Sequence, residues 1–373
     1  MTNQKTPIKI CYVATSAGDW GGASRSLFLL LKKIDRTKIS PFVLFPGEGT
    51  LTAEMEKRDI PYRIWGQMRE FHGIYQYAKD IVRAIRFFRA EKIEILHINH
   101  SGYWRPAEVL AAKILNIPVI THYRVIVDKP GPFVKYSTLV IANSEYTRDA
   151  SVSNGVEKIA IHNIVDVERY DAAVSLREEL DIDQNTLVVA FLGQIKKIKG
   201  IHLFIAMAKR IRREHVVFLI AGACRGEQSG GGSYTEAELT SEIGEDSRFI
   251  YLGHRTDVQN VYKTSDIIVM PSQWDEPFGL INVESGASKL PIVASRAGGI
   301  PEVIKHGENG FLVERDDLDE LTQSVEMLLE NKALREEIGK RARQIVEQRF
   351  VEAPVRVLEK TYQQIMDREF SAT

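Results

Sequence analysis

Cysteine and long apolar stretches are both scarce in this sequence. Its 373 residues include two cysteines, Cys11 and Cys224, each in or beside a short apolar run. Two such residues do not make the disulfide framework of a small secreted protein or a cysteine-rich metal site, so we expect free, buried thiols, as in a reducing cytoplasm. No apolar run approaches the roughly 20 residues of a membrane-spanning helix.

The N-terminus also lacks the layout of a secretory signal peptide, because MTNQKTPIKICYVATS is polar before its short apolar run. Apolar residues make up 44% of the chain, which is typical of globular proteins. A chain of this length is too long for one compact core and suits two domains of ordinary size. We therefore expect a cytoplasmic protein whose only contact with a membrane would be peripheral, at the inner face.

A large excess of one charge is absent as well, but the net charge of −1 hides an asymmetry. Residues 1–163 contain 23 Lys and Arg against 15 Asp and Glu, whereas the rest contains 26 against 35. This difference indicates that the two halves meet different partners. No basic stripe is interleaved with aromatic residues at a stacking spacing, so we expect no nucleic-acid partner.

Short Val-, Ile- and Leu-rich runs alternate with amphipathic stretches along the whole chain. The runs are IKICYVAT, ISPFVLF, IEILHIN, IPVITHY and TLVIANS in the first half, and LVVAFLG, VVFLIAG, RFIYLG, DIIVMPS and LPIVAS in the second. Such runs are typical of buried parallel strands, and their alternation with helices predicts doubly wound α/β domains. We expect two Rossmann-like domains, residues 1–163 and 164–352, with a last helix at about 353–373 that packs back on the first.

The stretch EPFGLINVE places Glu276 and Glu284 on either side of the junction between a predicted strand and the helix that follows it. Ligands of open parallel sheets bind at the carboxyl ends of the strands. First-turn amides of the helix, at Phe278, Gly279 and Leu280, would form an anion site suited to a diphosphate. Glu284 would then accept hydrogen bonds from ribose hydroxyls and Glu276 from a sugar. The alternative is that both are ordinary carboxylates near a helix N-terminus.

The same stretch and its surroundings resemble the retaining glycosyltransferases of family 4. Two glutamates separated by seven residues are followed by SGASKLPIVAS and the turn AGGIPEVI, and are preceded by DIIVMPS; GENGFLV follows further on. At the other end, Gly21 and Gly22 in GDWGGASRSL match the glycine pair of the family's first strand–helix loop. The resemblance implies a GT-B fold, two Rossmann-like domains facing across a cleft, with the donor on the second and the acceptor on the first.

A loop after the first strand of the second domain, GQIKKIKG, supplies further candidates for the diphosphate. Lys199 precedes Gly200 and a helix, from where its charge can reach a diphosphate. Family members usually have arginine where this chain has Gln194, which can donate a hydrogen bond but adds no charge. Lys196 or Lys197 would supply the missing cation. The alternative is that these lysines are only solvated loop charges.

Histidines end two strands of the first domain. His122 in IPVITHY matches the family's cleft histidine, which lies near the donor sugar and the acceptor. His100 in LHINHSGYW is a second candidate, although a histidine at a strand end is often a structural hydrogen-bonding group. Tyr103 and Arg105 follow it and could line an acceptor site or simply pack on a loop.

Neither a metal nor a resident cofactor is expected, since the resemblance implies that helix dipoles and cations stabilise the leaving diphosphate. The acidic run RDDLDE at residues 315–320 fits the cap and first turn of a helix better than a metal site. Another local feature is ACRGEQSGGGSYTEAEL, which we interpret as a mobile surface loop, with a functional lid as the alternative.

The resulting hypothesis is a retaining glycosyltransferase that moves a sugar from a nucleoside diphosphate to a glycan, lipid-linked or small-molecule acceptor, in bacterial-type polysaccharide or glycoconjugate synthesis. Two alternatives stay open: a nucleotide-sugar epimerase or hydrolase on the same fold, and a non-catalytic partner subunit. The base and the sugar of the donor are left undetermined.

One helix of the basic half suggests where an acceptor could be delivered. In KDIVRAIRFFRAEK, Arg83, Arg86 and Arg89 recur every three residues, opposite an apolar side formed by Ile81, Val82, Ile85 and Phe88. Such a helix could rest on an anionic membrane. The alternative is that the arginines only solvate the outer face of a helix that covers a sheet.

Overall fold

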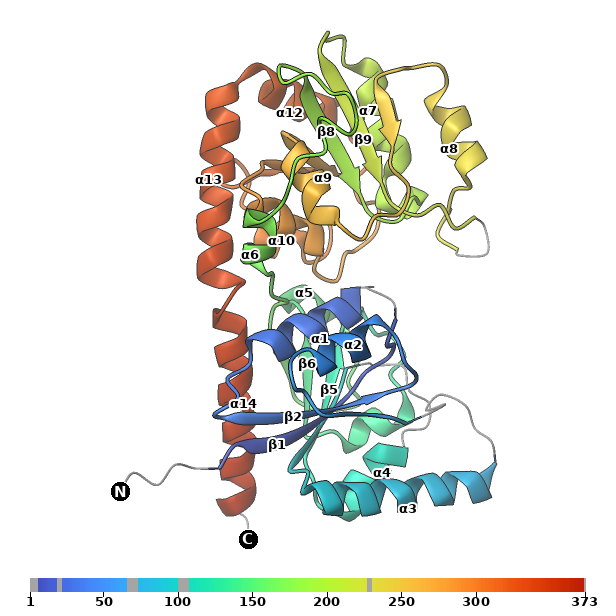
Figure 1. Cartoon of the computed structure of the whole chain (residues 1–373), viewed down its shortest axis with the longest axis vertical. Coiled ribbons are helices and arrows are strands. Elements are labelled where there is room, and N and C mark those ends of the chain that lie inside the picture. Colours follow the sequence, from blue (N-terminus) through green and yellow to red (C-terminus); the bar gives the residue numbers. More distant parts are fainter. Residues whose placement is uncertain (1–5, 19–21, 66–72, 100–106, 227–229, 372–373) are drawn as a thin grey trace. The chain divides into compact units, whose positions relative to one another are not determined.

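The chain forms two compact units, seen in the computed structural model (Figure 1). The structure describes residues 6–18, 22–65, 73–99, 107–226 and 230–371. Unit 1 consists of Met1–Ile164 and Glu352–Thr373, and unit 2 of Val165–Val351. Helix α14 (Ala353–Ser371), at the C-terminal end of the sequence, therefore belongs to unit 1. The boundary between the units falls after Ile164, whereas the sequence pattern placed it after residue 163.

Unit 1 is a parallel sheet with helices on both faces. Its described strands follow the order β3-β2-β1-β4-β5-β6-β7, with every pair parallel. The elements are β1 (Ile8–Val13), α1 (Gly22–Lys33), β2 (Ile39–Phe45), α2 (Thr50–Glu56), β3 (Tyr62–Ile64), α3 (Ile74–Glu91), β4 (Ile95–Ile98), α4 (Ala107–Ile114), β5 (Val119–Tyr123), η1 (Pro132–Tyr136), β6 (Leu139–Ala142), α5 (Glu145–Ala150), β7 (Lys158–Ala160) and α14 (Ala353–Ser371).

Unit 2 repeats this plan with the described strands in the order β10-β9-β8-β11-β12-β13, again all parallel. Its elements are α6 (Val167–Asp171), β8 (Leu187–Leu192), η2 (Lys197–Lys199), α7 (Ile201–Arg210), β9 (Val216–Ala221), α8 (Glu236–Ile243), β10 (Phe249–Tyr251), α9 (Val258–Thr264), β11 (Ile267–Met270), α10 (Leu280–Ala287), β12 (Ile292–Ser295), α11 (Ile300–Val303), β13 (Phe311–Val313), α12 (Leu318–Glu330) and α13 (Lys332–Arg349). The predicted pair of Rossmann-like domains is confirmed.

The two faces of each sheet form separate cores, because successive side chains of a strand point to opposite sides. In β1, Ile10 and Tyr12 pack with α1, α2 and α14, whereas Cys11 and Val13 pack with α3 and α4. In unit 2 one face is covered by α9, α10 and α13 and the other by α7, α8 and α12. Strands that are apolar on both faces are the reason that the runs in the sequence are continuous rather than alternating.

Helix α14 completes the core of unit 1. Val355, Leu358 and Tyr362 are at most 2% exposed and pack against the β1 side of the sheet. The carboxylate of Glu359 accepts a hydrogen bond from the Asp35 amide at 2.8 Å and from Lys38 Nζ at 3.3 Å. Unit 1 is therefore built from two segments that are far apart in sequence.

All ten predicted strands are present, but three short ones were missed. β3, β7 and β13 have three residues each, as does β10. β10 lies in the longer apolar run FIYL, whereas the apolar runs at the missed strands are shorter and do not stand out from neighbouring loops. The acidic run 315–320 is a helix start as expected: Asp317 is the N-cap of α12 and accepts from the Glu320 amide at 2.8 Å.

The structure bears on three local features that the sequence singled out, and the interpretations of Val82 and Cys224 need correction. In the glycine-rich stretch 223–239, of which 223–226 and 230–239 are described, residues 230–234 pair with the loop that follows β8. Lys197 N donates to Gly232 O at 2.8 Å and Tyr234 N to Ile195 O at 3.0 Å. This pairing defines the backbone path of residues 230–234, and the mobility of the loop stays a prediction. On α3, Val82 is 46% exposed and does not belong to the apolar side, which instead includes Phe87 at 4%. Cys224 is only partly buried, unlike Cys11.

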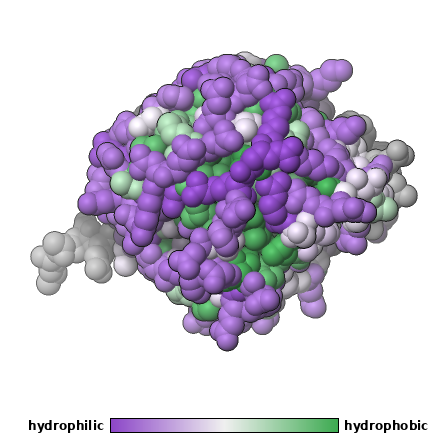
Figure 2. Space-filling model, turned by 90° about the horizontal axis from the view of Figure 1, so that it is seen from above, coloured by the Kyte–Doolittle hydropathy of each residue, from purple (hydrophilic) through white to green (hydrophobic). Residues whose placement is uncertain are grey.

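No helix in the described part of the chain is long and apolar enough to cross a membrane. The face drawn in Figure 2 is mainly hydrophilic, with apolar residues visible in the gaps between polar ones.

Candidate active site

Two loops of unit 2 meet at the carboxyl ends of the neighbouring strands β8 and β11. The Gln273 amide donates to Ile198 O at 2.8 Å, which ties the loop after β11 to the loop after β8. At Gly200, with φ +80°, an added Cβ would lie 1.8 Å from the carbonyl oxygen of Pro271. Only glycine permits this approach, and it brings the preceding residue, Lys199, to the Glu276 loop.

Glu276 is buried at the junction of these loops and forms an ion pair. Its side chain is 8% exposed, and its Oε1 accepts hydrogen bonds from Lys199 Nζ at 2.6 Å and from Ser272 Oγ at 2.9 Å. Lys199 Nζ also lies 4.8 Å from the centroid of the Trp274 ring. Two of the residues predicted from the sequence are thus in direct contact, and Ser272 and Trp274 are additions that the sequence pattern did not single out.

The glycine pair of AGGIPEVI fixes the backbone of Glu276. The Gly299 amide donates to the carbonyl oxygen of Glu276 at 2.8 Å. Gly298 has φ +56°, and an added Cβ would lie 2.3 Å from the same oxygen. The spacing between the glutamate motif and the later glycine pair therefore has a structural cause: the turn packs directly on Glu276.

Helix α10 starts slightly later than the sequence pattern suggested. Its first residue is Leu280 and Gly279 is its N-cap, so the Phe278 amide precedes the helix. The Phe278 side chain is 1% exposed and packs edge-on against Phe350. The N-terminus of α10, with the positive end of the helix dipole, lies directly after the Glu276 loop. Within its first turn, the Asn282 amide donates to Gly279 O at 3.1 Å.

Glu284 lies one turn inside α10 and is also buried. It is 5% exposed, and its Oε2 accepts from the hydroxyl of Tyr262 at 2.9 Å. Tyr262 is fully buried at the end of LGHRTDVQNVY, on α9. The tyrosine holds the carboxylate in one orientation, and a buried tyrosine at a helix end gives no sequence signal that would distinguish it from core packing.

The other candidates of the β8 loop differ in exposure. Gln194 is exposed, directly after β8. Lys196 is 8% exposed. Lys197 lines a separate pocket, about 660 Å³ in volume, together with Glu238 and Glu242 near α8. The hydrogen bonds that Glu276 Oε1 accepts at 2.6 Å and 2.9 Å come from Lys199 and Ser272 rather than from Gln194, Lys196 or Lys197.

In unit 1, His122 belongs to a buried chain of hydrogen-bonding side chains. Its Nδ1 lies 3.2 Å from His97 Nε2, the His97 Nδ1 lies 2.7 Å from the hydroxyl of Tyr362, and that hydroxyl lies 3.1 Å from the hydroxyl of Tyr12. His122 is 3% exposed, and its Nε2 has no hydrogen-bond partner among the residues that the structure describes. The strand end that carries His122 is thus joined to α14.

Burial keeps both histidines neutral. Burial and the nearby Arg124 lower the pKa of His97 to about 3, and burial, Arg124 and His97 lower the pKa of His122 well below its ordinary value. Burial also lowers the pKa of Arg124 to about 9. Its guanidinium donates to Asn99 Oδ1 at 2.8 Å and Asn163 Oδ1 at 2.7 Å.

Of the glycine pair, Gly22 is the first residue of α1, and the Asn99 side chain donates to the carbonyl oxygen of Ala23 in the same turn at 3.1 Å. Gly21, His100, Tyr103 and Arg105 lie outside the described residues. Within the described ranges no group of three or more His, Cys, Asp or Glu residues could hold a metal ion.

Two protein-family models together match most of the chain. Residues 20–169 match Glycosyltransferase Family 4 and residues 174–345 match Glycosyl transferases group 1, so one match falls on each unit. Among relatives, a D-inositol 3-phosphate glycosyltransferase of Corynebacterium aurimucosum is 31% identical over 375 residues, covering 90% of this chain and 83% of that protein. Spore coat protein SA of Bacillus subtilis is 28% identical over 212 residues, covering 56% of each chain.

Solved structures agree on the fold. Anabaena HepE in complex with UDP and glucose has a TM-score of 0.79 and 24% identity, covering 97% of this chain and 100% of that one. A glycosyltransferase from Rickettsia africae has a TM-score of 0.83 and 22% identity, covering 97% and 99%.

The fold is that of the GT-B glycosyltransferases. Within that class the chain belongs to the group 1 glycosyltransferases of family 4. With the spore coat protein and with the D-inositol 3-phosphate glycosyltransferase of Corynebacterium kroppenstedtii, the match spans 56% and 64% of the relative, which is less than two thirds of their length.

Proposed function

We propose that the chain transfers a sugar from a nucleoside-diphosphate donor to a glycan, lipid-linked or small-molecule acceptor, with retention of the anomeric configuration. The observation that carries the proposal is the Lys199–Glu276 pair at the N-terminus of α10. A buried carboxylate and a cation beside a helix N-terminus form a site that suits both a sugar and a diphosphate.

The residues of unit 2 would divide the donor between them. Lys199 and the amides of Gly279 and Leu280 would bind the diphosphate, Glu284 the ribose hydroxyls and Glu276 the hydroxyls of the sugar. The ion pair explains how both roles fit one place. When a diphosphate pairs with Lys199, the carboxylate of Glu276 loses one hydrogen-bond donor. It can then accept hydrogen bonds from sugar hydroxyls instead. Gln194 would donate to the diphosphate, with Lys196 or Lys197 as the additional cation.

The residues of unit 1 would serve the acceptor. His122 would lie near the reacting centre, where its neutral ring can exchange hydrogen bonds but adds no charge. Gly21 and Gly22 would meet the phosphates at the start of α1. His100, Tyr103 and Arg105 are acceptor-side candidates. A peripheral contact with an anionic membrane, in polysaccharide or glycoconjugate synthesis, would deliver a lipid-linked acceptor.

In the proposed reaction the bond between the anomeric carbon and the phosphate oxygen breaks, and a bond to the acceptor oxygen forms on the same face of the sugar. The acceptor proton passes to the leaving diphosphate. The fixed dipole of α10 and the charge of Lys199 stabilise the negative charge that develops on this group. No metal or resident cofactor takes part in this proposal.

The test begins with calorimetry of UDP and GDP, because the HepE structures contain UDP and UDP-glucose. We expect saturable binding of one of them, unchanged by a chelator. The matching nucleotide sugars are then incubated with and without a panel of glycan acceptors, and the anomeric configuration of the product is determined by NMR. Acceptor-independent loss of the donor would favour an epimerase or hydrolase, and absence of any nucleotide binding would favour a non-catalytic subunit.

A further inference from the structure

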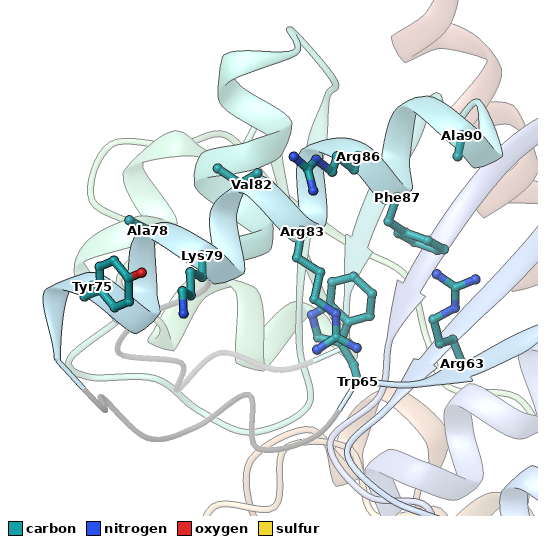
Figure 3. Close-up of a pocket in the computed structure, with 10 residues that line it drawn as sticks. All are labelled: Arg63, Trp65, Tyr75, Ala78, Lys79, Val82, Arg83, Arg86, Phe87 and Ala90. Carbon is teal, nitrogen blue, oxygen red and sulfur yellow. The ribbon is translucent and has the colours of Figure 1, made fainter.

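A groove of about 720 Å³ lies between α3 and the end of β3, in unit 1 (Figure 3). No residue of the candidate donor site contributes to it. We call it the α3 groove, and its lining residues are Arg63, Trp65, Tyr75, Ala78, Lys79, Val82, Arg83, Arg86, Phe87 and Ala90. Its volume falls in the range of sites that bind small ligands or a few rings of a larger one.

The floor of the α3 groove is aromatic and its aromatic faces are covered by cations. Trp65 and Phe87 are 6% and 4% exposed, with ring centroids 5.2 Å apart. The guanidinium of Arg83 lies 4.1 Å from the Trp65 ring and that of Arg63 lies 5.0 Å from the Phe87 ring (Figure 3). Lys79 lies 4.3 Å from the Tyr75 ring in the same way.

The cations of the α3 groove are available to an anion. Four of its ten lining residues are Lys or Arg and none is acidic. In the described part of the chain, Arg63, Lys79, Arg83 and Arg86 form no ion pair, whereas the two acids of α3 are engaged elsewhere: Asp80 accepts from Gln76, and Glu91 pairs with Lys9. The buried Glu108 lies below the floor and accepts from Trp65 Nε1 at 2.7 Å.

Stacking prepares an arginine for anion recognition. When a guanidinium stacks on an aromatic ring, the orientation of its plane is fixed. The N–H groups at its edge can still form paired hydrogen bonds with a carboxylate or a phosphate. Less side-chain entropy is then lost when the anion binds. The α3 groove has two such stacked arginines, one on α3 and one on β3.

We propose that the α3 groove binds an acidic segment of the glycan acceptor through its carboxylate or phosphate groups. This identification of the ligand as the acceptor rests on the proposed glycosyltransferase function. A glycan is favoured over a membrane because the site is concave and its Trp65 and Phe87 rings are buried beneath arginines, so they cannot insert into lipid. It is favoured over a nucleic acid because the ring faces that bases would stack on are already occupied.

The test measures binding by calorimetry, with an oligomannuronate tetrasaccharide as the acidic probe and maltotetraose as the neutral one. We expect the acidic probe to bind at least about tenfold more tightly at low salt, and less tightly at 0.5 M salt because the charges are exposed. The variant Arg83→Gln/Arg86→Gln should weaken it by about tenfold or more. Arg83→Lys, which keeps the charge but loses the planar fork, should also weaken it.

The matched control is Arg89→Gln/Lys113→Gln, which removes two exposed cations from α3 and α4 outside the groove and should leave the affinity within about twofold. UDP binding is measured in every variant. If the wild-type chain binds UDP but not the acidic probe, the acidic-acceptor proposal alone is overturned. If the wild-type chain does not bind UDP, the proposed function is contradicted. Equal weakening by the control, or full affinity in Arg83→Lys, would overturn the groove assignment.

A membrane arm completes the test. Vesicles of phosphatidylglycerol and phosphatidylcholine are compared with vesicles of phosphatidylcholine alone by sedimentation. Pelleting with the anionic vesicles that is lost in Arg83→Gln/Arg86→Gln, without binding of the acidic tetrasaccharide, would overturn the glycan assignment in favour of a lipid surface.

Discussion

At the scale of single residues, the site depends on charges that are buried with their partners. Glu276 is held by Lys199 and Ser272, and Glu284 by Tyr262. A buried carboxylate without a partner is costly, so each of these partners stabilises a carboxylate that the proposed reaction needs. The same hydrogen bonds fix the direction of the carboxylate, which is a condition for binding a sugar in one orientation.

Replacement of Glu276 by glutamine tests this arrangement. Glu276→Gln keeps the size and the hydrogen bond from Ser272 but removes the charge, so we expect turnover of the donor to fall by about 100- to 1,000-fold while the chain stays folded. The measurement is the transfer rate with saturating donor, together with a thermal melt. Glu314→Gln, at an exposed ion pair with Arg296 in the same unit, is the control and should leave the rate unchanged. A wild-type rate in Glu276→Gln would remove this residue from the site.

Protonation of the buried histidines has a predictable effect on stability. The pKa of His97 is about 3 in the folded chain, against an ordinary value of 6.5, and that of His122 is lowered as well. Below pH 6.5 the unfolded chain binds protons that the folded chain does not, so stability falls as pH falls, by about 1.4 kcal/mol per pH unit for each histidine. At pH values well above 6.5 these two groups contribute no pH dependence, because they are neutral in both states.

NMR titration of the nine histidines measures this directly. We expect the ring signals of His97 and His122, assigned through Gln variants, to stay constant from pH 7.5 to 5. A midpoint near 6 for His122 would contradict a neutral ring in the folded chain. Urea unfolding at the same pH values gives the matching free energies.

At the scale of elements, the site is a junction of loops rather than a property of one motif. The loop after β8 carries Lys199, the loop after β11 carries Glu276, and the turn before α11 packs on Glu276 through Gly298. Each of these segments follows a strand carboxyl end, where the parallel sheet brings loops from distant parts of the sequence together. Glycine is needed at positions 200 and 298 because an added Cβ would overlap the carbonyl oxygen of Pro271 at the first and that of Glu276 at the second.

Gly200→Ala tests this close approach. The added Cβ would lie 1.8 Å from Pro271 O, so the two loops must separate, and we expect a loss of more than about 2 kcal/mol of stability and weaker donor binding. Gly253→Ala is the matched control, because Gly253 also has a positive φ, +64°, but no atom lies within 4 Å of its added Cβ. Its free energy of unfolding should fall by only about 1 kcal/mol, the cost of the backbone strain. Equal losses in urea unfolding would contradict a specific role of the contact.

At the scale of the whole molecule, the chain leaves unit 1, forms unit 2 and returns to unit 1. The return places Leu358 and Tyr362 in the first core and joins Tyr362 to His97. The core of unit 1 therefore includes helix α14 from the far end of the sequence, whereas unit 2 is continuous in sequence.

Leu358→Ala should destabilise unit 1 although the residue lies near the C-terminal end. Truncating a leucine that is 1% exposed typically costs about 2 to 5 kcal/mol. We expect faster hydrogen exchange in β1 and β4, with β8 and β11 unaffected. Leu328→Ala, at a fully buried position of α12, should give the opposite pattern. Faster exchange in β8 and β11 in the Leu358 variant would contradict the division into these units.

Sequence patterns alone predicted ten of the thirteen described strands, the fold class and the family. Buried parallel strands leave continuous apolar runs, and the glutamate and glycine motifs keep their order and spacing. The tertiary structure alone decided which side chains meet. The Lys199–Glu276 pair joins residues 77 positions apart, and the chain from His122 to Tyr362 crosses from a strand to a helix at the other end of the sequence. Such contacts depend on strand order and on the close packing of loops, which local patterns do not encode. The same reason applies to the α3 groove: the arginines were visible in the sequence, but the stacking on Trp65 arises only where β3 ends beside α3.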